Sequence, residues 1–351
     1  MRLINTRTVR LVECISTIPP YAILSHRWEN QEVTFQEMQD ERAKKKAGFH
    51  KIVQCCRQAL ADGFSFAWVD TCCIDKTSSA ELSEAINSMY LWYKEAARCY
   101  AYLSDVHYVQ QPGQSNMRPG MPLLLGAHGT WTNLRNSQWF SRGWTLQELV
   151  APADVRFFSS EWTFLGTKGD LGPLLSEITG IDLGTLAGRD IRRLSVAKRM
   201  SWASKRVTTR KEDVAYCLLG IFGVNMPLLY GEGERAFIRL QEEIMKDSDD
   251  QTLFAWEDSC NEFDSQVVLG DDGYLRGPLA RSPAEFAKSG SFVPYRQWES
   301  SQPYTMTNHG LRIELPMHIM PGSSGRCLAV LGCYSEDDFR SPIGIYVKLT
   351  R

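Results

Sequence analysis

The chain has 351 residues, of which 43% are hydrophobic and 23% are charged, and its formal net charge at pH 7 is -2. This composition is ordinary for a soluble globular protein, and the length can accommodate two or three domains. The near-neutral balance excludes a global basic surface for nucleic acid or an acidic membrane. Because no apolar run could cross a bilayer and the N-terminus lacks a secretion signal, we expect a cytoplasmic protein that binds neither nucleic acid nor membrane.

The ten cysteines do not form a recognisable framework, and two pairs are adjacent in sequence, Cys55 with Cys56 and Cys72 with Cys73. Neighbouring cysteines rarely bridge each other, and no C-x-x-C pair is present to start a zinc site. We therefore expect reduced thiols that pack as small hydrophobic groups, no structural disulfides and no metal site.

The first 160 residues alternate short apolar strands with helices, a pattern typical of a parallel sheet flanked by helices. A first buried strand is expected over residues 21–24, and it ends at Ser25, His26, Arg27 and Trp28. Open α/β sheets form ligand sites where strands deliver polar side chains at their carboxyl ends. An ordinary loop after a strand fits this stretch equally well.

A helix is expected over residues 49–61, where apolar side chains recur every three or four positions, and Asp62 with Gly63 ends it. Residues 64–69 form the second expected strand, followed by Asp70 and a loop over residues 71–77. Two further strands complete the sheet, at residues 99–103 and 155–158.

The helix after the 71–77 loop has a clear start signal, because Ser78 and Glu81 fit a capping box. Glu84 lies off the apolar face of this helix, so we expect it to be solvated. Residues 110–122 are rich in Gln, Pro, Gly and Ser, which indicates a surface loop inserted between the third and fourth strands.

A helix is also expected around residues 144–149, where Trp144 and Glu148 are four positions apart and share a face. A carboxylate held against an indole is partly desolvated, which favours its protonated form and suits it to chemistry near neutral pH. For a single glutamate, however, a solvated position on an amphipathic helix is the more common case.

The second half of the chain changes character twice. Residues 165–250 lose the strand pattern, and helices are expected at residues 195–204, 213–222 and 234–246. From about residue 265, alternating runs at residues 311–315, 327–331 and 343–349 favour a β-rich module. We therefore predict three parts, at residues 1–160, 161–258 and 259–351, with the helical extension packed on the first part. The strand pattern reaches almost to Arg351, which suggests an incomplete sheet and a chain that is a fragment.

Four ordered segments within residues 21–160 resemble the fungal heterokaryon incompatibility (HET) domain. They read YAILSHRW at residues 21–28, WVDTCCID at 68–75, EAINSM at 84–89 and RGWTLQEL at 142–149. Residues 210–222 and 226–233 are similar to the region that commonly follows this domain in large fungal proteins. The resemblance implies a fungal incompatibility and programmed cell-death effector, similar in purpose to innate immunity.

HET domains are considered distant relatives of TIR domains, and residues 21–28 and 66–70 resemble the first two TIR strands. The spacing from Trp144 to Glu148 resembles the TIR helix whose glutamate is catalytic in NAD-cleaving members, with Thr145 where that family has cysteine. The resemblance implies a TIR-like sheet and an NAD glycohydrolase with Glu148 as its catalytic carboxylate. It also implies NAD as substrate without a cofactor, self-association when active, and an upstream sensor.

Cleavage of the nicotinamide–ribose bond develops positive charge on the ribose, because nicotinamide departs as a neutral molecule. A nearby carboxylate stabilises that charge, and no acid is needed for the leaving group. Arg27 is the strongest candidate to bind the pyrophosphate, and Trp28 or Trp144 could stack on a base. The substrate-binding side chains predicted beside Glu148 are Ser25, His26, Arg27, Trp28, Asp70 and Trp144.

Two other function classes fit the sequence. A non-catalytic death-signalling module, which self-assembles and recruits partners, needs no functional Glu148. A thiol hydrolase using Cys72 or Cys73 with His26 fits less well, since neither cysteine follows a helix-opening turn that would lower its pKa.

Overall fold

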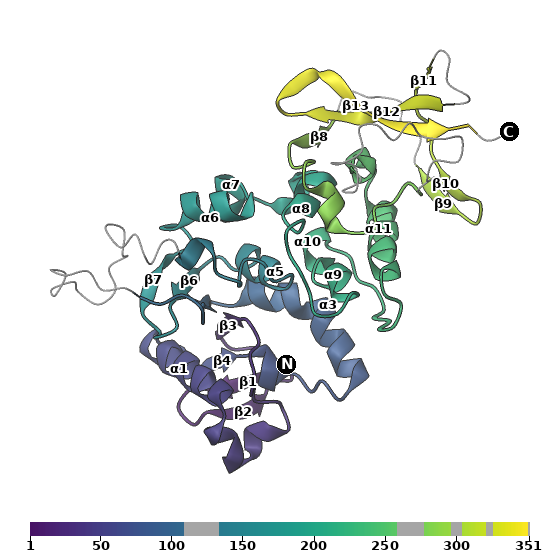
Figure 1. The fold of residues 1–351 in the computed structure, drawn as a ribbon. Coiled ribbons are helices and arrows are strands. Elements are labelled where there is room, and N and C mark those ends of the chain that lie inside the picture. The colour runs from purple at the N-terminus through teal and green to yellow at the C-terminus, as the bar shows by residue number, and fades with distance from the viewer. Residues whose placement is uncertain (109–132, 258–276, 296–303, 321–325, 350–351) are drawn as a thin grey trace. The chain divides into compact units, whose positions relative to one another are not determined.

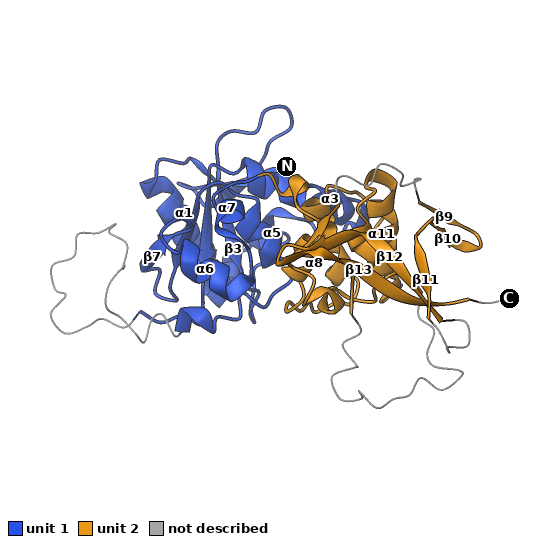
Figure 2. Cartoon of the chain, turned by 90° about the horizontal axis from the view of Figure 1, so that it is seen from above, with its two compact units in different colours: residues 1–189 blue, residues 190–351 orange. Residues whose placement is uncertain are grey.

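A computed structural model describes residues 1–108, 133–257, 277–295, 304–320 and 326–349 (Figure 1). The surface loop predicted at residues 110–122 lies outside these described residues. The chain divides into two compact units, residues 1–189 and 190–351 (Figure 2). The boundary falls inside the segment that the sequence assigns to the helical extension, and the three-part division stays a prediction.

The first unit is built on a seven-stranded sheet with the strand order β2-β1-β4-β3-β5-β6-β7. Its four central strands are parallel, which confirms the arrangement predicted from the sequence. They are β4 (Phe66–Trp68), β3 (Ala22–His26), β5 (Arg98–Tyr102) and β6 (Val155–Phe158). The edges are antiparallel and comprise β1 (Arg2–Asn5), β2 (Arg10–Glu13) and β7 (Phe164–Thr167).

Strand β3 is the centre of this sheet, and all five of its residues are buried between β4 and β5. The sequence ends this strand at Leu24, whereas the structure extends it to His26 because Ser25 and His26 pair with Ala101 and Tyr102 of β5. The polar side chains therefore begin inside the strand, where the sheet fixes their directions.

Three helices pack around the parallel strands. Helix α1 (Ala47–Ala61) contacts β4, α5 (Thr145–Val150) contacts β3, and α3 (Ser79–Glu95) contacts α5. The apolar face predicted for α3 is confirmed by the burial of Ala85, Ile86, Met89 and Tyr93, and Glu84 is exposed as expected. The sequence thus identifies the helices that cover the sheet.

Two local predictions need correction. The stretch expected to be a loop contains the four-residue helix α2 (Asp70–Cys73), which is too short to produce a helical periodicity in the sequence. At the start of α3, the Ser78 hydroxyl accepts from the Glu81 N–H, as a capping box requires. The Glu81 carboxylate instead accepts from Asp75 N–H and pairs with Arg2, so only half of the capping box forms.

The remainder of the first unit and the start of the second are helical. Helices α6 (Gly172–Thr179) and α7 (Leu183–Leu186) close the first unit, and α8 (Val196–Ser201) and α11 (Arg235–Asp247) confirm two predicted helices. The helix predicted at residues 213–222 is in fact two, α9 (Asp213–Tyr216) and α10 (Leu219–Phe222). The break occurs where Leu218 N–H bonds the carbonyl only three residues back, at Ala215, which tightens the chain into a turn. Single 3₁₀ turns occur at Glu37–Gln39, Glu41–Lys45, Ile191–Arg193, Gln251–Phe254 and Pro283–Phe286.

The β-rich module predicted near the end of the chain is confirmed. Its larger sheet has the order β11-β12-β13, with β8 also paired to β12, and every pairing is antiparallel. These strands are β8 (Phe292–Pro294), β11 (Met317–Ile319), β12 (Arg326–Ser335) and β13 (Asp338–Lys348). A separate hairpin pairs β9 (Thr305–Thr307) with β10 (Gly310–Arg312). Within the described ranges, no helix is both long and apolar enough to cross a bilayer.

We expect thiol titration of the denatured, unreduced protein to find ten free groups, the full cysteine content. The cysteines that the structure describes are free thiols, and all except Cys14 are buried. A buried thiol has no partner with which to oxidise unless a second sulfur lies within bonding geometry. A titration that finds far fewer than ten groups would contradict the expectation.

Candidate active site

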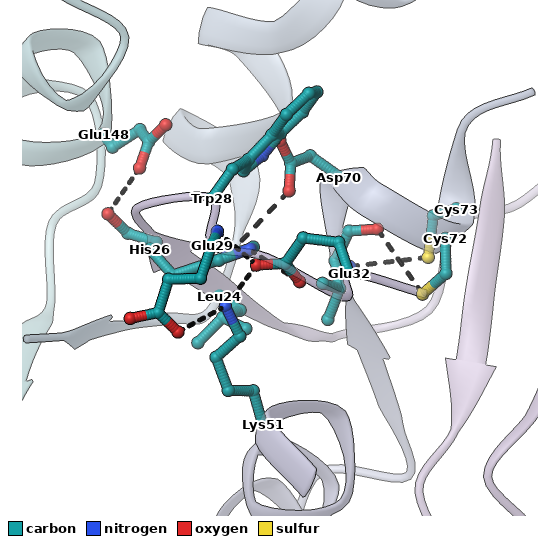
Figure 3. A network of polar contacts seen from close by, with 12 residues as sticks. Leu24, His26, Trp28, Glu29, Glu32, Lys51, Asp70, Cys72, Cys73 and Glu148 are labelled. Carbon is teal, nitrogen blue, oxygen red and sulfur yellow. Dashed lines mark hydrogen bonds and ion pairs between the residues drawn. The ribbon is translucent and has the colours of Figure 1, made fainter. Parts of the chain in front are cut away.

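The carboxylate of Glu148, on α5, lies against the carboxyl end of β3 (Figure 3). The Ser25 hydroxyl donates a hydrogen bond to Glu148 Oε2. The same hydroxyl accepts a hydrogen bond from the indole N–H of Trp139 at 2.9 Å. Glu148 is only 5% exposed, so it is largely shielded from bulk water. Its carboxylate is therefore held in one position by a chain of two hydrogen bonds.

The short helix that carries Glu148 is fixed by bonds at its start. The Thr145 hydroxyl reaches the carbonyl oxygens of both Trp139 and Arg142, which ties the segment before α5 to its first turn. From α3, the Tyr93 hydroxyl donates to the Leu24 carbonyl at 2.9 Å and so joins α3 to β3 beside Glu148. Thr145 thus has a clear structural role at the start of α5.

The electrostatic environment keeps Glu148 close to its titration point. Burial raises the pKa of Glu148 to about 7, although the positive charge of Arg142 and the hydrogen bond from Ser25 act in the opposite direction. Both protonation states are therefore populated at neutral pH. A side chain with a perturbed pKa at the edge of an α/β sheet is a typical candidate for catalysis.

The two polar residues at the end of β3 leave opposite faces of the sheet, as alternate residues of a strand must. Ser25 faces α5, whereas His26 faces the side of Lys51 and is 3% exposed. Its ring nitrogens lie 3.9 Å from Asp70 Oδ1 and 3.9 Å from Glu32 Oε2, too far for hydrogen bonds. Burial, with a contribution from Lys51, lowers the pKa of His26 to about 3, so its ring is neutral at pH 7.

Several buried polar atoms in this region have no hydrogen bond with any described residue. Among them are Nε2 of His26 and Oδ1 of Asp70. Leaving such a group unpaired costs about 1–3 kcal/mol, so a ligand or an ordered water that bonded to either atom would be stabilised there. These atoms lie where the carboxyl ends of β3 and β4 meet.

Trp28 forms the exposed part of the site, since 42% of the residue is accessible. Its indole N–H donates to Asp70 Oδ2 at 2.7 Å. The Lys76 ammonium lies 3.6 Å from the centre of the indole ring, and the Arg142 guanidinium lies 5.4 Å from it. Burial acts to raise the pKa of Asp70, but Lys76 and Arg142 outweigh it and lower that pKa, so Asp70 is ionised.

The structure brings some of the predicted site residues together and leaves others apart. Ser25 contacts Glu148, and Asp70 contacts Trp28 and faces His26 (Figure 3). Arg27 is exposed and donates to the side chain of Gln138, and Trp144 is half-buried. Four residues that shape the site were not predicted from the sequence, namely Trp139, Tyr93, Lys76 and Arg142. Arg142 lies in a segment that resembles the HET domain, and Lys76 directly follows another such segment. These positions were the only signal in the sequence that could have pointed to the two residues.

The thiols near the site are poorly placed for catalysis. Cys72 and Cys73 are buried in α2, and their sulfur atoms bond to the backbone of Val69. A hydrogen bond with Cys73, together with burial, raises the pKa of Cys72 well above its ordinary value. A thiol nucleophile needs the opposite shift, so the thiol hydrolase hypothesis loses its physical basis. No group of three or more His, Cys, Asp or Glu side chains in the described part of the chain could hold a metal ion.

Comparison with known proteins identifies the region that contains this site. A family model described as heterokaryon incompatibility protein (HET) matches residues 21–148, from the start of β3 to Glu148 itself. The vegetative incompatibility protein HET-E-1 of Podospora anserina is 48% identical over 233 residues. Residues 21–148 are a HET domain.

The match to HET-E-1 covers 66% of this chain but only 16% of that much longer relative. A second family model, described as a domain of unknown function (DUF8212), matches residues 235–341. No solved structure gives a significant match to the chain. Ser25 and Glu148, which bond to each other, lie near opposite ends of the HET domain.

Proposed function

We propose that this protein is a heterokaryon incompatibility effector whose HET domain hydrolyses NAD at the nicotinamide–ribose bond. The incompatibility role is supported by the similarity to HET-E-1, which is described as a vegetative incompatibility protein. The hydrolytic role rests on the position and environment of one carboxylate, that of Glu148. We also propose, from the resemblance to TIR domains, that the fold is TIR-like, that the active form self-associates in the cytoplasm, and that a sensor triggers it.

The observation that carries the hydrolytic proposal is the buried, hydrogen-bonded carboxylate of Glu148 with a pKa of about 7. A glutamate needed only for packing would be replaced at no loss by an apolar residue, since burying an ionisable group is unfavourable. Retaining a carboxylate under these conditions is useful where charge develops during a reaction. The carboxyl ends of parallel strands are also where α/β sheets bind ligands.

The proposed reaction breaks the bond between the ribose C1′ and the nicotinamide nitrogen. The bonding electron pair leaves with nicotinamide, which departs neutral, and the ribose acquires oxocarbenium character. The ionised carboxylate of Glu148 stabilises that positive charge, and it does so strongly because the site excludes water. Water then adds to C1′ and releases one proton, giving ADP-ribose. The hydrogen bond from Ser25, whose hydroxyl is itself held by Trp139, keeps the carboxylate in position throughout.

The test is to incubate the full chain with NAD and to separate the products by chromatography. We expect nicotinamide and ADP-ribose in equal amounts, at a rate per chain that increases with protein concentration if the active form self-associates. If no nicotinamide appears even from the most concentrated, assembled protein, the hydrolytic proposal is wrong. A non-catalytic module that acts by self-assembly and recruitment of partners then takes its place.

A further inference from the structure

A buried lysine contacts the carboxyl end of the helix that carries Glu148. Lys168 is 5% exposed, and its ammonium donates to the Pro152 carbonyl at 2.5 Å and to the Leu149 carbonyl at 3.3 Å. Leu149 directly follows Glu148 on α5. Within the described part of the chain, no carboxylate forms an ion pair with this ammonium. Its partners are therefore the backbone of α5 and of the turn that follows it.

The sequence explains why these carbonyls need a donor from outside the helix. The last carbonyls of any helix lack internal partners, and α5 has only six residues. Pro152 has no N–H, so it cannot bond to the Glu148 carbonyl four residues back. The Glu148 carbonyl instead accepts a weak bond from the Cys99 thiol of β5 at 3.9 Å. The next carbonyl, that of Leu149, accepts from Lys168.

The backbone of Lys168 is itself fixed by the sheet. Lys168 directly follows β7, whose Thr167 pairs with Arg156 of β6. Its N–H donates to the carbonyl of Val155, the first residue of β6, at 2.8 Å. The ammonium therefore reaches α5 from a position that strand pairing defines.

A lysine is a costly residue for this place. Burial disfavours the charged ammonium and lowers the pKa of Lys168, although Cys99 and Asp154 act in the opposite direction. An apolar side chain would avoid that cost, but it would leave two carbonyls without a donor. Because the Thr145 hydroxyl ties the start of α5 and Lys168 ties its end, Glu148 lies between two fixed points.

We infer that Lys168 is a positioning residue, which holds the carboxyl end of α5 against the sheet and so keeps the Glu148 carboxylate buried beside Ser25. The inference rests on the proposed function for the use of that carboxylate in catalysis. Lys168 acts through the backbone of α5 and not on the substrate.

Removal of Lys168 distinguishes this role from a simple effect of charge. A lysine that acted only as a positive charge would favour the ionised form of Glu148, so its loss would raise the pKa of Glu148. A lysine that holds α5 in place has the opposite effect, because a loosened helix lets water reach the carboxylate. The titratable and charged groups that also act on Glu148 are Arg142, Asp70 and Tyr93, and the exchange leaves all three in the chain.

The test follows the Glu148 carboxylate by ¹³C NMR in the full chain with labelled glutamate side chains. Its signal is the one that disappears in Glu148→Gln, and in the parent it should titrate with a midpoint of about 7. In Lys168→Met we expect that midpoint to fall by about one to two pH units, as the carboxylate gains water. Methionine has a similar length and lacks the charge and the donors.

Lys51→Met is the matched control for this titration. Lys51 is also 5% exposed and lies in the same unit, but it bonds to Glu29 and Glu32 rather than to α5. Its loss should leave the Glu148 midpoint near 7. A midpoint that does not fall in Lys168→Met overturns the inference, and so does an equal fall in Lys51→Met. If Lys168→Met does not fold, Lys168→Gln, which keeps an amide donor, replaces it and is judged by the same shift.

Turnover of NAD separates this inference from the proposed function. At pH 8, Lys168→Met should lower kcat about ten- to a hundredfold and leave KM within about twofold of the parent value, because a displaced carboxylate weakens catalysis without changing substrate contacts. An unchanged kcat despite a shifted midpoint would overturn the positioning role. If the midpoint shifts but the parent cleaves no NAD, the placement of Glu148 by Lys168 stands and the hydrolytic function fails.

Discussion

Replacing Glu148 by glutamine should reduce NAD turnover by about a hundred- to a thousandfold, the usual effect of removing one electrostatic stabiliser of a transition state. Glutamine has nearly the same shape, and its carbonyl oxygen can still accept the hydrogen bond from Ser25. Only the negative charge beside the ribose is lost. The measurement is the rate of nicotinamide release per chain, taken at a concentration where the wild-type protein is fully assembled.

Glu84→Gln is the matched control for this variant, because Glu84 is an exposed glutamate on the neighbouring helix α3. It undergoes the same chemical change and should retain wild-type turnover. If Glu148→Gln released nicotinamide as fast as the wild type, Glu148 would not be catalytic. A loss of turnover with an equal loss in Glu84→Gln would point to a general effect of charge.

The Glu148→Gln variant should become more stable relative to the wild type as the pH rises from about 4.5 to about 7. These two values are the ordinary pKa of a glutamate and the pKa that burial gives to Glu148 in the folded protein. In the unfolded chain Glu148 ionises near 4.5, whereas in the folded protein it resists ionisation until about 7. Rising pH therefore favours the unfolded wild-type chain, and glutamine, which cannot ionise, avoids this loss. The full difference corresponds to about 3 kcal/mol in the free energy of unfolding.

Urea unfolding of both proteins at pH 5 and at pH 8 measures this linkage without requiring any substrate. Above pH 7 the difference between the two proteins should stop increasing, because Glu148 is then ionised in both states of the wild type. Wild-type turnover of NAD should rise over the same pH interval in which wild-type stability falls, since the ionised carboxylate is the form proposed to be catalytic. Unfolding free energies of the two proteins that follow parallel lines against pH would show that the pKa of Glu148 is not raised.

The sequence was sufficient to predict the parallel centre of the sheet, because buried strands such as residues 21–24 form short apolar runs. It did not predict β1 or β7, whose four-residue stretches are only partly buried and have no clear pattern. The four residues of α2 read as a loop because they contain barely one helical turn. Continuous burial therefore left a signal in the sequence, whereas short or partly exposed elements did not.

The site was predictable where it depended on strand ends and unpredictable where it depended on packing. Parallel strands bring their carboxyl ends to one edge of a sheet, so the sequence alone places Ser25 and Asp70 in the same region. The contribution of Trp139 depends on how its segment folds back over β3, which no local pattern records. The position of Lys76 over Trp28 likewise depends on where the chain goes after α2, so spacing in the sequence could not reveal it.

The hydrogen bond between Ser25 and Glu148 joins residues that are 123 positions apart in the chain. Contacts of such long range close large loops, so they form late in folding. During synthesis, strand β3, which carries Ser25, emerges from the ribosome long before α5 does. A chain that is still being made, or that ends before Glu148, would contain the polar end of β3 without its carboxylate partner. Under the proposed function, the domain would therefore gain its activity only after nearly all of it has been made and folded.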